Sequence, residues 1–427
     1  MPDLTSKLLP RLQTHTLPGL DIGDNVIHPK YADQSILNIP SSVCRWMNVP
    51  ELGAGPLTPE ILSPLGNGIR RVILILMDAL ALHRLQGWMS DGTAPIWQSL
   101  VDDGLLAPLT SVVPSTTNAA LTTLWTGRSP AAHGIVGYEM WLKEYGMVAN
   151  MISHAPMAFR GDTGGLERAG FEPEKFLNLP TLGSHLHTHG VAAHAFQHYA
   201  IANSGLSRMF LKDVDIHPFR TPTELWVNVR QLIESKPRER MYIWTYWGIL
   251  DGLSHSYGPD DERAAAEFTS FSAAFEQFFL NRLSPEIRKD TLVILTADHG
   301  QIHTPIYPSY SLSNHPELTR QLHIMPTGEN RLAYLFTRPG QRDAVIHYFE
   351  SVWEGQFALI SPEDAVDAGL FGPGNPHPDL RDRLGDLIVV AKDSAYLWWD
   401  KKEDFLLGRH GGLHPEDMLV PFLAVRL

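Results

Sequence analysis

Three apolar segments, each ending at an aspartate, most constrain how this 427-residue chain can fold. RVILILM precedes Asp78, MYIWTYWGIL precedes Asp251, and TLVILTA precedes Asp298. Uninterrupted apolar runs of this length are typical of strands that are buried on both faces of a parallel sheet. Because the ligand crevice of an open α/β sheet lies at the carboxyl ends of its strands, the three aspartates are predicted to converge.

Helical segments alternate with these strands along the chain. Residues 94–103, 222–235 and 262–282 are predicted helices, and the last of them carries four phenylalanines on one face. Strands that alternate with helices form a mainly parallel sheet with helices packed on it. The predicted fold class is therefore α/β, with a mainly parallel sheet flanked by helices and a small inserted α/β subdomain.

The same pattern predicts how the chain is divided. Residues 1–68 are rich in proline and glycine and are predicted to be an extended lead-in packed on the core. Residues 69–302 and 403–427 supply the α/β core, and the final apolar segment closes it as a last strand. Residues 303–402 have enough strand and helix signals for a small inserted α/β cap subdomain.

Composition narrows the functional class. The net charge is −13, from 34 basic and 47 acidic residues, which disfavours a protein that binds nucleic acid through phosphate contacts. A single cysteine, Cys44, excludes an intramolecular disulfide and a cysteine-cluster zinc site. The sequence shows no secretory signal and no apolar stretch that could span a bilayer, so a soluble, cytoplasmic protein is expected.

Histidines accompany the aspartates. His255 follows Asp251 by four positions, His299 directly follows Asp298, and His410 lies in the glycine-rich segment GRHGGLHPEDMLVP. Aspartate and histidine are the ligands that zinc, manganese and iron accept where cysteine is lacking. Each signal also has a structural explanation, such as a helix cap, a surface pair or a turn, and His414 competes with His410. Together they predict a divalent-metal site.

A candidate nucleophile lies in the segment PSTTNAALTTLWTG. Ser115, Thr116 and Thr117 follow a predicted strand and precede a predicted helix. A hydroxyl there faces backbone N–H groups that suit a phosphoryl oxygen, although it could equally act as an N-cap. A hydroxyl is a weak nucleophile unless a base or a metal lowers its pKa. The predicted metal site would supply that activation, so the two predictions support each other.

Five of these motifs, in this order, resemble the alkaline phosphatase superfamily and most closely its type I phosphodiesterase/nucleotide pyrophosphatase branch. They are LILMDAL, PSTTNAALTTLWTGRSPAAHGI, DGLSHSYGP, TADHG and HGGLHPEDMLVP, and they all lie between residues 71 and 425. The resemblance implies two divalent ions, most simply zinc, with manganese or iron as alternatives. It assigns Asp78, Asp298 and His299 to one ion and Asp251, His255 and His410 to the other.

The resemblance also implies catalytic roles. Thr117 is the implied nucleophile and bridges toward the metals, because Thr126 and Gly127 follow it at the spacing of the family. The amide of Asn118 is expected to help bind a phosphoryl oxygen. Many nucleotide pyrophosphatases have asparagine where this chain has Tyr138, 21 residues after Thr117, so the substrate pocket is expected to differ.

The implied activity is metal-dependent hydrolysis of phosphodiester or pyrophosphate bonds in a phosphorylated, nucleotide-like small molecule, through a phosphothreonine-type intermediate. A phosphomonoesterase, a phosphosugar mutase, a phosphonate hydrolase and a non-catalytic binding module stay open as alternatives. No membrane partner is expected, and self-association stays open. Packing or surface exposure is the simpler explanation for the histidine-rich stretch 185–198, for His303 and for the aromatic run 396–399. The aromatic run could also stack on a substrate.

Overall fold

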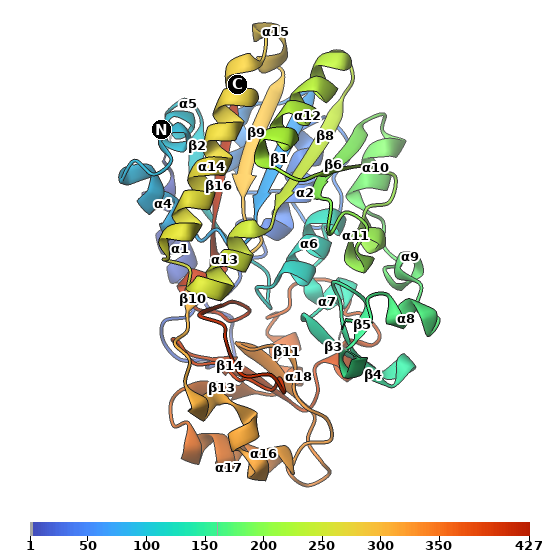
Figure 1. Ribbon diagram of the computed structural model, residues 1–427, viewed down its shortest axis with the longest axis vertical. Coiled ribbons are helices and arrows are strands. Elements are labelled where there is room, and N and C mark those ends of the chain that lie inside the picture. The colour runs from blue at the N-terminus through green and yellow to red at the C-terminus, as the bar shows by residue number, and fades with distance from the viewer. Residues whose placement is uncertain (1–2, 160) are drawn as a thin grey trace.

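The computed structural model describes residues 3–159 and 161–427. Its main element is a seven-stranded sheet with the strand order β2-β16-β9-β1-β8-β6-β7 (Figure 1). The strands are β1 (Arg71–Met77), β2 (Leu105–Thr110), β6 (Ala192–His198), β7 (Asp215–Phe219), β8 (Met241–Trp247), β9 (Thr291–Thr296) and β16 (Leu419–Arg426). Strand β16 runs antiparallel to β2 and β9, whereas the other pairs are parallel. The prediction of a mainly parallel α/β sheet is confirmed.

The register of the central strands brings their carboxyl ends to one level. Met77 of β1 pairs with Trp247 of β8, and Leu76 pairs with Thr296 of β9. All three strands are buried along their whole length, as their uninterrupted apolar sequences predict. The segments that follow them therefore leave the sheet side by side.

Helices cover both faces of this sheet. Trp244 of β8 packs on Trp125 of α6 (Thr117–Thr126), whereas Trp247 packs on Phe271 of α14 (Glu262–Phe278). Because side chains an odd number of positions apart point to opposite faces of a strand, α6 and α14 lie on opposite sides of the sheet. Helices α4 (Leu82–Ser90), α5 (Pro95–Asp103) and α12 (Pro222–Ser235) complete the predicted set.

A second sheet lies below the first in Figure 1 and is antiparallel throughout. Its order is β13-β14-β12-β11-β3-β4-β5. The strands are β3 (Glu139–Leu142), β4 (Met147–Asn150), β5 (Ala155–Pro156), β11 (Thr327–Glu329), β12 (Leu332–Leu335), β13 (Phe357–Ile360) and β14 (Leu387–Ala391). This sheet is wider than the segment 303–402 that we expected to form a subdomain, because β3, β4 and β5 join it from residues 139–156.

The N-terminal segment differs from the extended lead-in that we expected. It contains the helices α1 (Thr5–Gln13), α2 (Ile39–Trp46) and α3 (Pro59–Leu65), whose apolar faces join the main core. The prolines in this segment do not prevent helices, because Pro40 and Pro59 lie in the first turn of a helix, where the backbone N–H that proline lacks has no partner within the helix. The domain boundaries drawn from the sequence stay a prediction.

Shorter elements connect these layers. The helices are α7 (Pro130–His133), α8 (Gly165–Arg168), α9 (Pro173–Phe176), α10 (Leu182–Thr188), α11 (Gly205–Phe210), α13 (Ile249–Tyr257), α15 (Pro285–Arg288), α16 (Pro316–Thr319), α17 (Arg342–Val352), α18 (Pro362–Asp367), α19 (Leu380–Arg383) and α20 (Pro415–Met418). Single 3₁₀ turns are η1 (Ile36–Asn38), η2 (Lys143–Tyr145), η3 (Met157–Phe159), η4 (Leu280–Arg282), η5 (Pro308–Tyr310) and η6 (Leu312–Asn314), and a two-stranded ribbon pairs β10 (Ile302–His303) with β15 (Gly408–Arg409).

Within the described residues, no helix has both the length and the apolar character that crossing a bilayer requires.

Candidate active site

The first group of predicted ligands lies where β1 and β9 end. The Nε2 atom of His299 lies 3.4 Å from Asp78 Oδ1 and 3.6 Å from Asp298 Oδ2. All three residues are buried. Tyr246 donates a hydrogen bond to the second oxygen of Asp78, and the backbone N–H of His299 donates to the second oxygen of Asp298. Asp78 Oδ1 and Asp298 Oδ2 have no hydrogen-bond partner among the described residues. We call these two oxygens bare; both lie near the His299 imidazole.

Electrostatics make this group a strong candidate for a cation. Burial raises the pKa of the Asp78 carboxyl well above its usual range, and the nearby Asp298 and Asp251 raise it further. Burial also raises the pKa of Asp298. Crowded buried carboxylates repel one another unless a positive charge lies between them. A divalent ion at the bare oxygens would remove this repulsion.

The second group lies on α13 and in the segment before β16. Asp251 Oδ1 lies 3.3 Å from His255 Nε2 and 3.8 Å from His410 Nε2. The predicted strand 241–250 ends at Trp247, so Asp251 and His255 lie one turn apart on a helix. Although burial raises the pKa of Asp251, His255 and His410 hold it well below its usual range. This carboxylate is already compensated, in contrast to Asp78.

The division of ligands between two ions is not as simple as the resemblance implies. The potential ligand atoms of Asp251, His299 and His410 also lie within 4.8 Å of one another, and the rings of His299 and His410 stack at 3.8 Å. His299 therefore lies between the two groups. His255 contacts Asp251 but lies outside this triplet.

All three histidines are held in one tautomer. The Nδ1 atoms lie 2.8–3.1 Å from backbone carbonyl oxygens, with the pairs His255–Gly408, His299–Gly300 and His410–Ser115. A carbonyl only accepts hydrogen bonds, so each Nδ1 carries a proton, and in the neutral ring Nε2 keeps its lone pair. Backbone contacts of this kind orient metal-binding imidazoles, and here each lone pair belongs to the Nε2 atom that lies near the carboxylates.

Among the three candidate hydroxyls, Thr117 is the one beside the ligands. Its Oγ1 lies 3.2 Å from His299 Nε2, at the first turn of α6. The Ser115 hydroxyl donates to the carbonyl of Gly412, and the Thr116 hydroxyl donates to Glu329. Those two hydroxyls are therefore engaged in other hydrogen bonds.

The two predicted substrate-binding residues lie on either side of this hydroxyl. The Asn118 side chain is buried; it donates to Gly137 O and accepts from the backbone N–H of Ala119. That leaves its backbone N–H, in the first turn of α6, as the group suited to a phosphoryl oxygen. Tyr138 is 38% exposed and lines the cleft.

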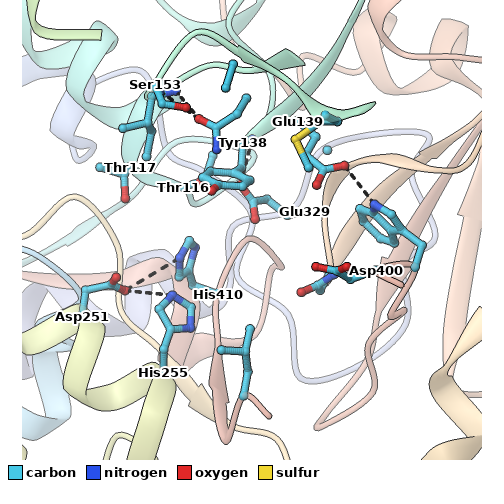
Figure 2. A pocket seen from close by; sticks show the side chains of 18 of the residues that line it. Thr116, Thr117, Tyr138, Glu139, Ser153, Asp251, His255, Glu329, Asp400 and His410 are labelled. Atoms are coloured by element: carbon cyan, nitrogen blue, oxygen red, sulfur yellow. Dashed lines mark hydrogen bonds and ion pairs between the residues drawn. The ribbon is translucent and has the colours of Figure 1, made fainter. Parts of the chain in front are cut away.

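A cleft of about 640 Å³ lies in front of these groups, between the two sheets. Figure 2 shows Asp251, His255 and His410 on one side and Tyr138, Glu139 and Glu329 on the other. Trp398 and Trp399 also line it, so part of the aromatic run 396–399 faces the cleft. Tyr396 and Leu397 are buried in a separate apolar cluster that packs on β12 and β14 of the antiparallel sheet.

Glu329 is the functional candidate that the sequence did not reveal. It ends β11, is half-buried, and accepts hydrogen bonds from the Thr116 hydroxyl at 2.5 Å and the Tyr138 N–H at 2.9 Å. Burial raises its pKa to about 8. Its place depends on β11 pairing with β3, from a segment far away in the chain, and no local motif signals that pairing.

The remaining histidines lie elsewhere. His414 caps α20 and contacts Asn25, so His410 is the histidine that joins the ligands. His303 lies on β10 and is exposed. Neither candidate group of metal ligands in the described residues includes a histidine from 185–198.

A hydroxyl held beside imidazoles and bare carboxylate oxygens is the arrangement that a metal-dependent hydrolase uses. Over residues 72–413 the sequence matches the type I phosphodiesterase / nucleotide pyrophosphatase family, and the chain belongs to this family. It is therefore a hydrolase that acts on phosphoester bonds, in a family that depends on metal. None of the curated proteins matches the chain in sequence.

Solved structures share the fold at low sequence identity. Murine ectonucleotide pyrophosphatase / phosphodiesterase 5 is 18% identical with a TM-score of 0.61, covering 83% of this chain and 87% of that chain. An inactive form of it in complex with AMP aligns equally, over 88% of that chain. Phosphonoacetate hydrolase from Sinorhizobium meliloti 1021, in complex with phosphonoformate, is 18% identical with a TM-score of 0.60, covering 83% and 90%. These likenesses show a common fold.

Proposed function

We propose that this protein hydrolyses phosphodiester or pyrophosphate bonds of nucleotide-like small molecules, with Thr117 as the nucleophile. The observation that carries the proposal is the position of the Thr117 hydroxyl, 3.2 Å from His299 Nε2, the atom that also lies 3.4 Å and 3.6 Å from the bare oxygens of Asp78 and Asp298. A nucleophile in that position has a cation site beside it to lower its pKa.

The residues fit two divalent ions. Asp78, Asp298 and His299 would hold one, and Asp251, His255 and His410 the other. Bound ions would favour the alkoxide of Thr117 and stabilise negative charge on the phosphoryl and leaving oxygens. Oxygen and nitrogen ligands without cysteine suit zinc first, with manganese and iron as alternatives.

The chain supplies the nucleophile and the oxyanion site. The Thr117 oxygen forms a bond to phosphorus as the bond to the leaving oxygen breaks, and the proton of the Thr117 hydroxyl passes through water to the leaving oxygen. Water then forms the new bond to phosphorus, the Thr117 oxygen leaves, and the proton of that water restores the hydroxyl. The backbone N–H of Asn118 and the N-terminal dipole of α6 bind a phosphoryl oxygen.

Two structural relatives guide the choice of substrates. AMP is bound in the murine phosphodiesterase 5 complex, and phosphonoformate in the phosphonoacetate hydrolase complex. Tyr138 stands at the mouth of the cleft, where its phenol can donate one hydrogen bond. Nucleotide-like diesters are therefore the first substrates to test and phosphonates the second. A cytoplasmic location and any self-association stay predictions.

The test compares 4-nitrophenyl phosphate with bis(4-nitrophenyl) phosphate, using protein that has been stripped with a chelator and reloaded with zinc. The proposal expects a clear preference for the diester, activity that is lost on stripping, and recovery on adding zinc or manganese. A preference for the monoester would move the function to a phosphatase. Diester hydrolysis that survives complete metal removal would contradict the role given to the aspartates and histidines.

A further inference from the structure

Gln301 is a buried amide beside the second group of ligands, and no step described above uses it. It lies two residues after His299, between β9 and β10, and its side chain is completely buried. Its Nε2 atom lies 3.0 Å from Oδ1 of Asp251, the same oxygen that faces His255 and His410. Gln301 does not line the large cleft, so it contacts a ligand without facing a substrate.

The contact with Asp251 fixes which end of the amide faces the ligands. A carboxylate only accepts hydrogen bonds, so the group beside Asp251 Oδ1 is the NH2 group of the amide. The Nδ1 atoms of His255 and His410 carry protons, so in the neutral rings the Nε2 atoms have no proton to give to this oxygen. Gln301 therefore supplies the hydrogen bond that orients the Asp251 carboxylate, and both Nε2 lone pairs are left for an ion.

The other end of the amide packs against the backbone that orients His255. A Cβ atom added to Gly408 would lie 2.6 Å from Gln301 Oε1, so the amide lies directly against this glycine. The Gly408 carbonyl in turn accepts the hydrogen bond from His255 Nδ1 at 2.8 Å. One side chain thus contacts both an aspartate ligand and the backbone that holds a histidine ligand.

The segment that carries Gln301 is itself held in place. The Gly300 N–H donates to the carbonyl of Asp417 at 2.9 Å, and Arg84 Nη2 lies 3.5 Å from the carbonyl oxygen of Gln301. Strand β10, which follows directly, pairs with β15. Because the backbone is fixed on both sides of the amide, the side chain can hold the carboxylate in one orientation before an ion binds.

The amide also has a cost for stability that points to a role in the site. Oε1 of Gln301 is buried and has no hydrogen-bond partner among the described residues. A buried polar atom without a partner destabilises a fold, so an apolar side chain of the same length would suit the packing at least as well. Residues that break a packing rule in this way are expected at functional sites.

We propose that Gln301 is a positioning residue for the second group of ligands. By orienting the Asp251 carboxylate and supporting the Gly408 carbonyl, it determines how tightly this group holds a divalent ion. The proposal rests on the metal-dependent function above and goes beyond it, because it gives a residue outside the ligand set control over the affinity for one ion. Contacts of this kind typically change metal affinity by about 10- to 100-fold.

The test replaces the amide with an apolar side chain of the same length, in Gln301→Met. Protein stripped with a chelator is titrated with zinc against a chromophoric competitor. We expect one ion to bind at least about tenfold more weakly and the other to keep its wild-type affinity. At limiting zinc, kcat for bis(4-nitrophenyl) phosphate should fall while KM stays the same, because Gln301 does not face the substrate. Excess zinc should restore most of the lost kcat.

Two further measurements separate a positioning role from a structural one. Metal-free Gln301→Met should unfold at a denaturant concentration no lower than metal-free wild type, since the variant removes the unpartnered oxygen. Gln301→Asn withdraws the amide by one carbon and should weaken zinc binding in the same way. The matched control is Gln98→Met. Gln98 also donates to an aspartate, Asp102, at 3.0 Å, but on the exposed surface of α5, so this variant should keep wild-type zinc binding.

The outcomes distinguish this inference from the proposed function. Wild-type affinity for both ions in Gln301→Met and Gln301→Asn would overturn the positioning role while the function stands. Weaker binding of both ions, together with a metal-free protein that unfolds more easily than wild type, would also overturn it, because Gln301 would then support the fold. A wild-type protein that binds no zinc, manganese or iron would overturn the metal-dependent function and with it this inference.

Discussion

The two walls of the large cleft are built in different ways. One wall is the carboxyl end of the parallel sheet, where Asp251, His255 and His410 gather beside Thr117. The other wall belongs to the antiparallel sheet and presents Glu329 and, beside it, Tyr138 and Trp398. The first wall has the groups for chemistry on any phosphoester. The second has groups whose contacts depend on the rest of the substrate, so we expect it to set substrate choice.

Removing the Thr117 hydroxyl should have the largest effect. Thr117→Ala is expected to lower kcat for a diester by a factor of about 10³ or more, because the nucleophile of the covalent step is gone. Thr117→Ser keeps a hydroxyl and should retain far more activity than the alanine variant. Steady-state kinetics with both variants measures the difference. Equal losses would mean that the methyl group, not the oxygen, matters at this position.

Neutralising one bare carboxylate should come next. Asp298→Asn keeps the shape but removes a charge that would hold a cation, so bound metal and kcat/KM should both fall, the latter by about 10². Elemental analysis of the dialysed protein and steady-state rates give the two quantities. Asp343→Asn, at an exposed aspartate on α17, is the control. Full metal content with normal activity in Asp298→Asn would contradict the ligand assignment.

The stability of the protein should respond to pH through His133. His133 is buried after α6; its Nδ1 accepts from the Ile135 N–H, and its Nε2 lies 3.0 Å from Thr123 Oγ1. Burial lowers its pKa from 6.5 to about 3. The stability that neutral His133 contributes is complete above pH 6.5 and is lost as the pH falls toward 3, about 2 kcal/mol by pH 5.

Denaturant unfolding at pH 7 and pH 5 measures this effect. The fall in unfolding free energy between the two values should be smaller in His133→Gln by about that amount. His347→Gln, at an exposed histidine, should keep the wild-type pH dependence. An unchanged pH dependence in His133→Gln would show that His133 does not control the acid stability of the protein.

The antiparallel wall should show the smallest effect on catalysis. Glu329→Ala removes the acceptor for the Thr116 hydroxyl and the Tyr138 N–H, and should lower kcat/KM about tenfold. Glu329→Gln should cost less, because its amide oxygen can accept both bonds. Rates for two diesters with different retained groups measure it. A loss of kcat/KM as large as in Asp298→Asn would contradict the view that the antiparallel wall sets substrate choice and not the chemical step.

The difference between the walls also explains what could be predicted. Asp78, Asp251 and Asp298 each follow a strand that its own apolar sequence reveals, and parallel register then brings their segments together. Without the resemblance, the three hydroxyls could not be separated in advance, because the choice depends on what Ser115 and Thr116 contact across the fold.

The antiparallel wall could not be seen in the sequence. Strands β3, β4 and β5 have four residues or fewer, and β3 and β4 include partly exposed positions. None of the three therefore shows a continuous apolar run in the sequence. The pairing of β3 with β11 joins residues 139 and 328, and that pairing places Glu329 beside Tyr138. Short strands paired across the chain carry no local pattern, so the contacts they bring together remain hidden.

The most direct test of the account is to trap the covalent intermediate. Zinc-loaded protein is mixed with excess bis(4-nitrophenyl) phosphate, quenched in acid within one turnover, and digested for mass spectrometry. The account predicts a 4-nitrophenyl phosphoryl group on Thr117, absent from the Thr117→Ala variant. Turnover with the adduct on another residue, or with no adduct under conditions that produce a burst of nitrophenol, would contradict Thr117 as the nucleophile.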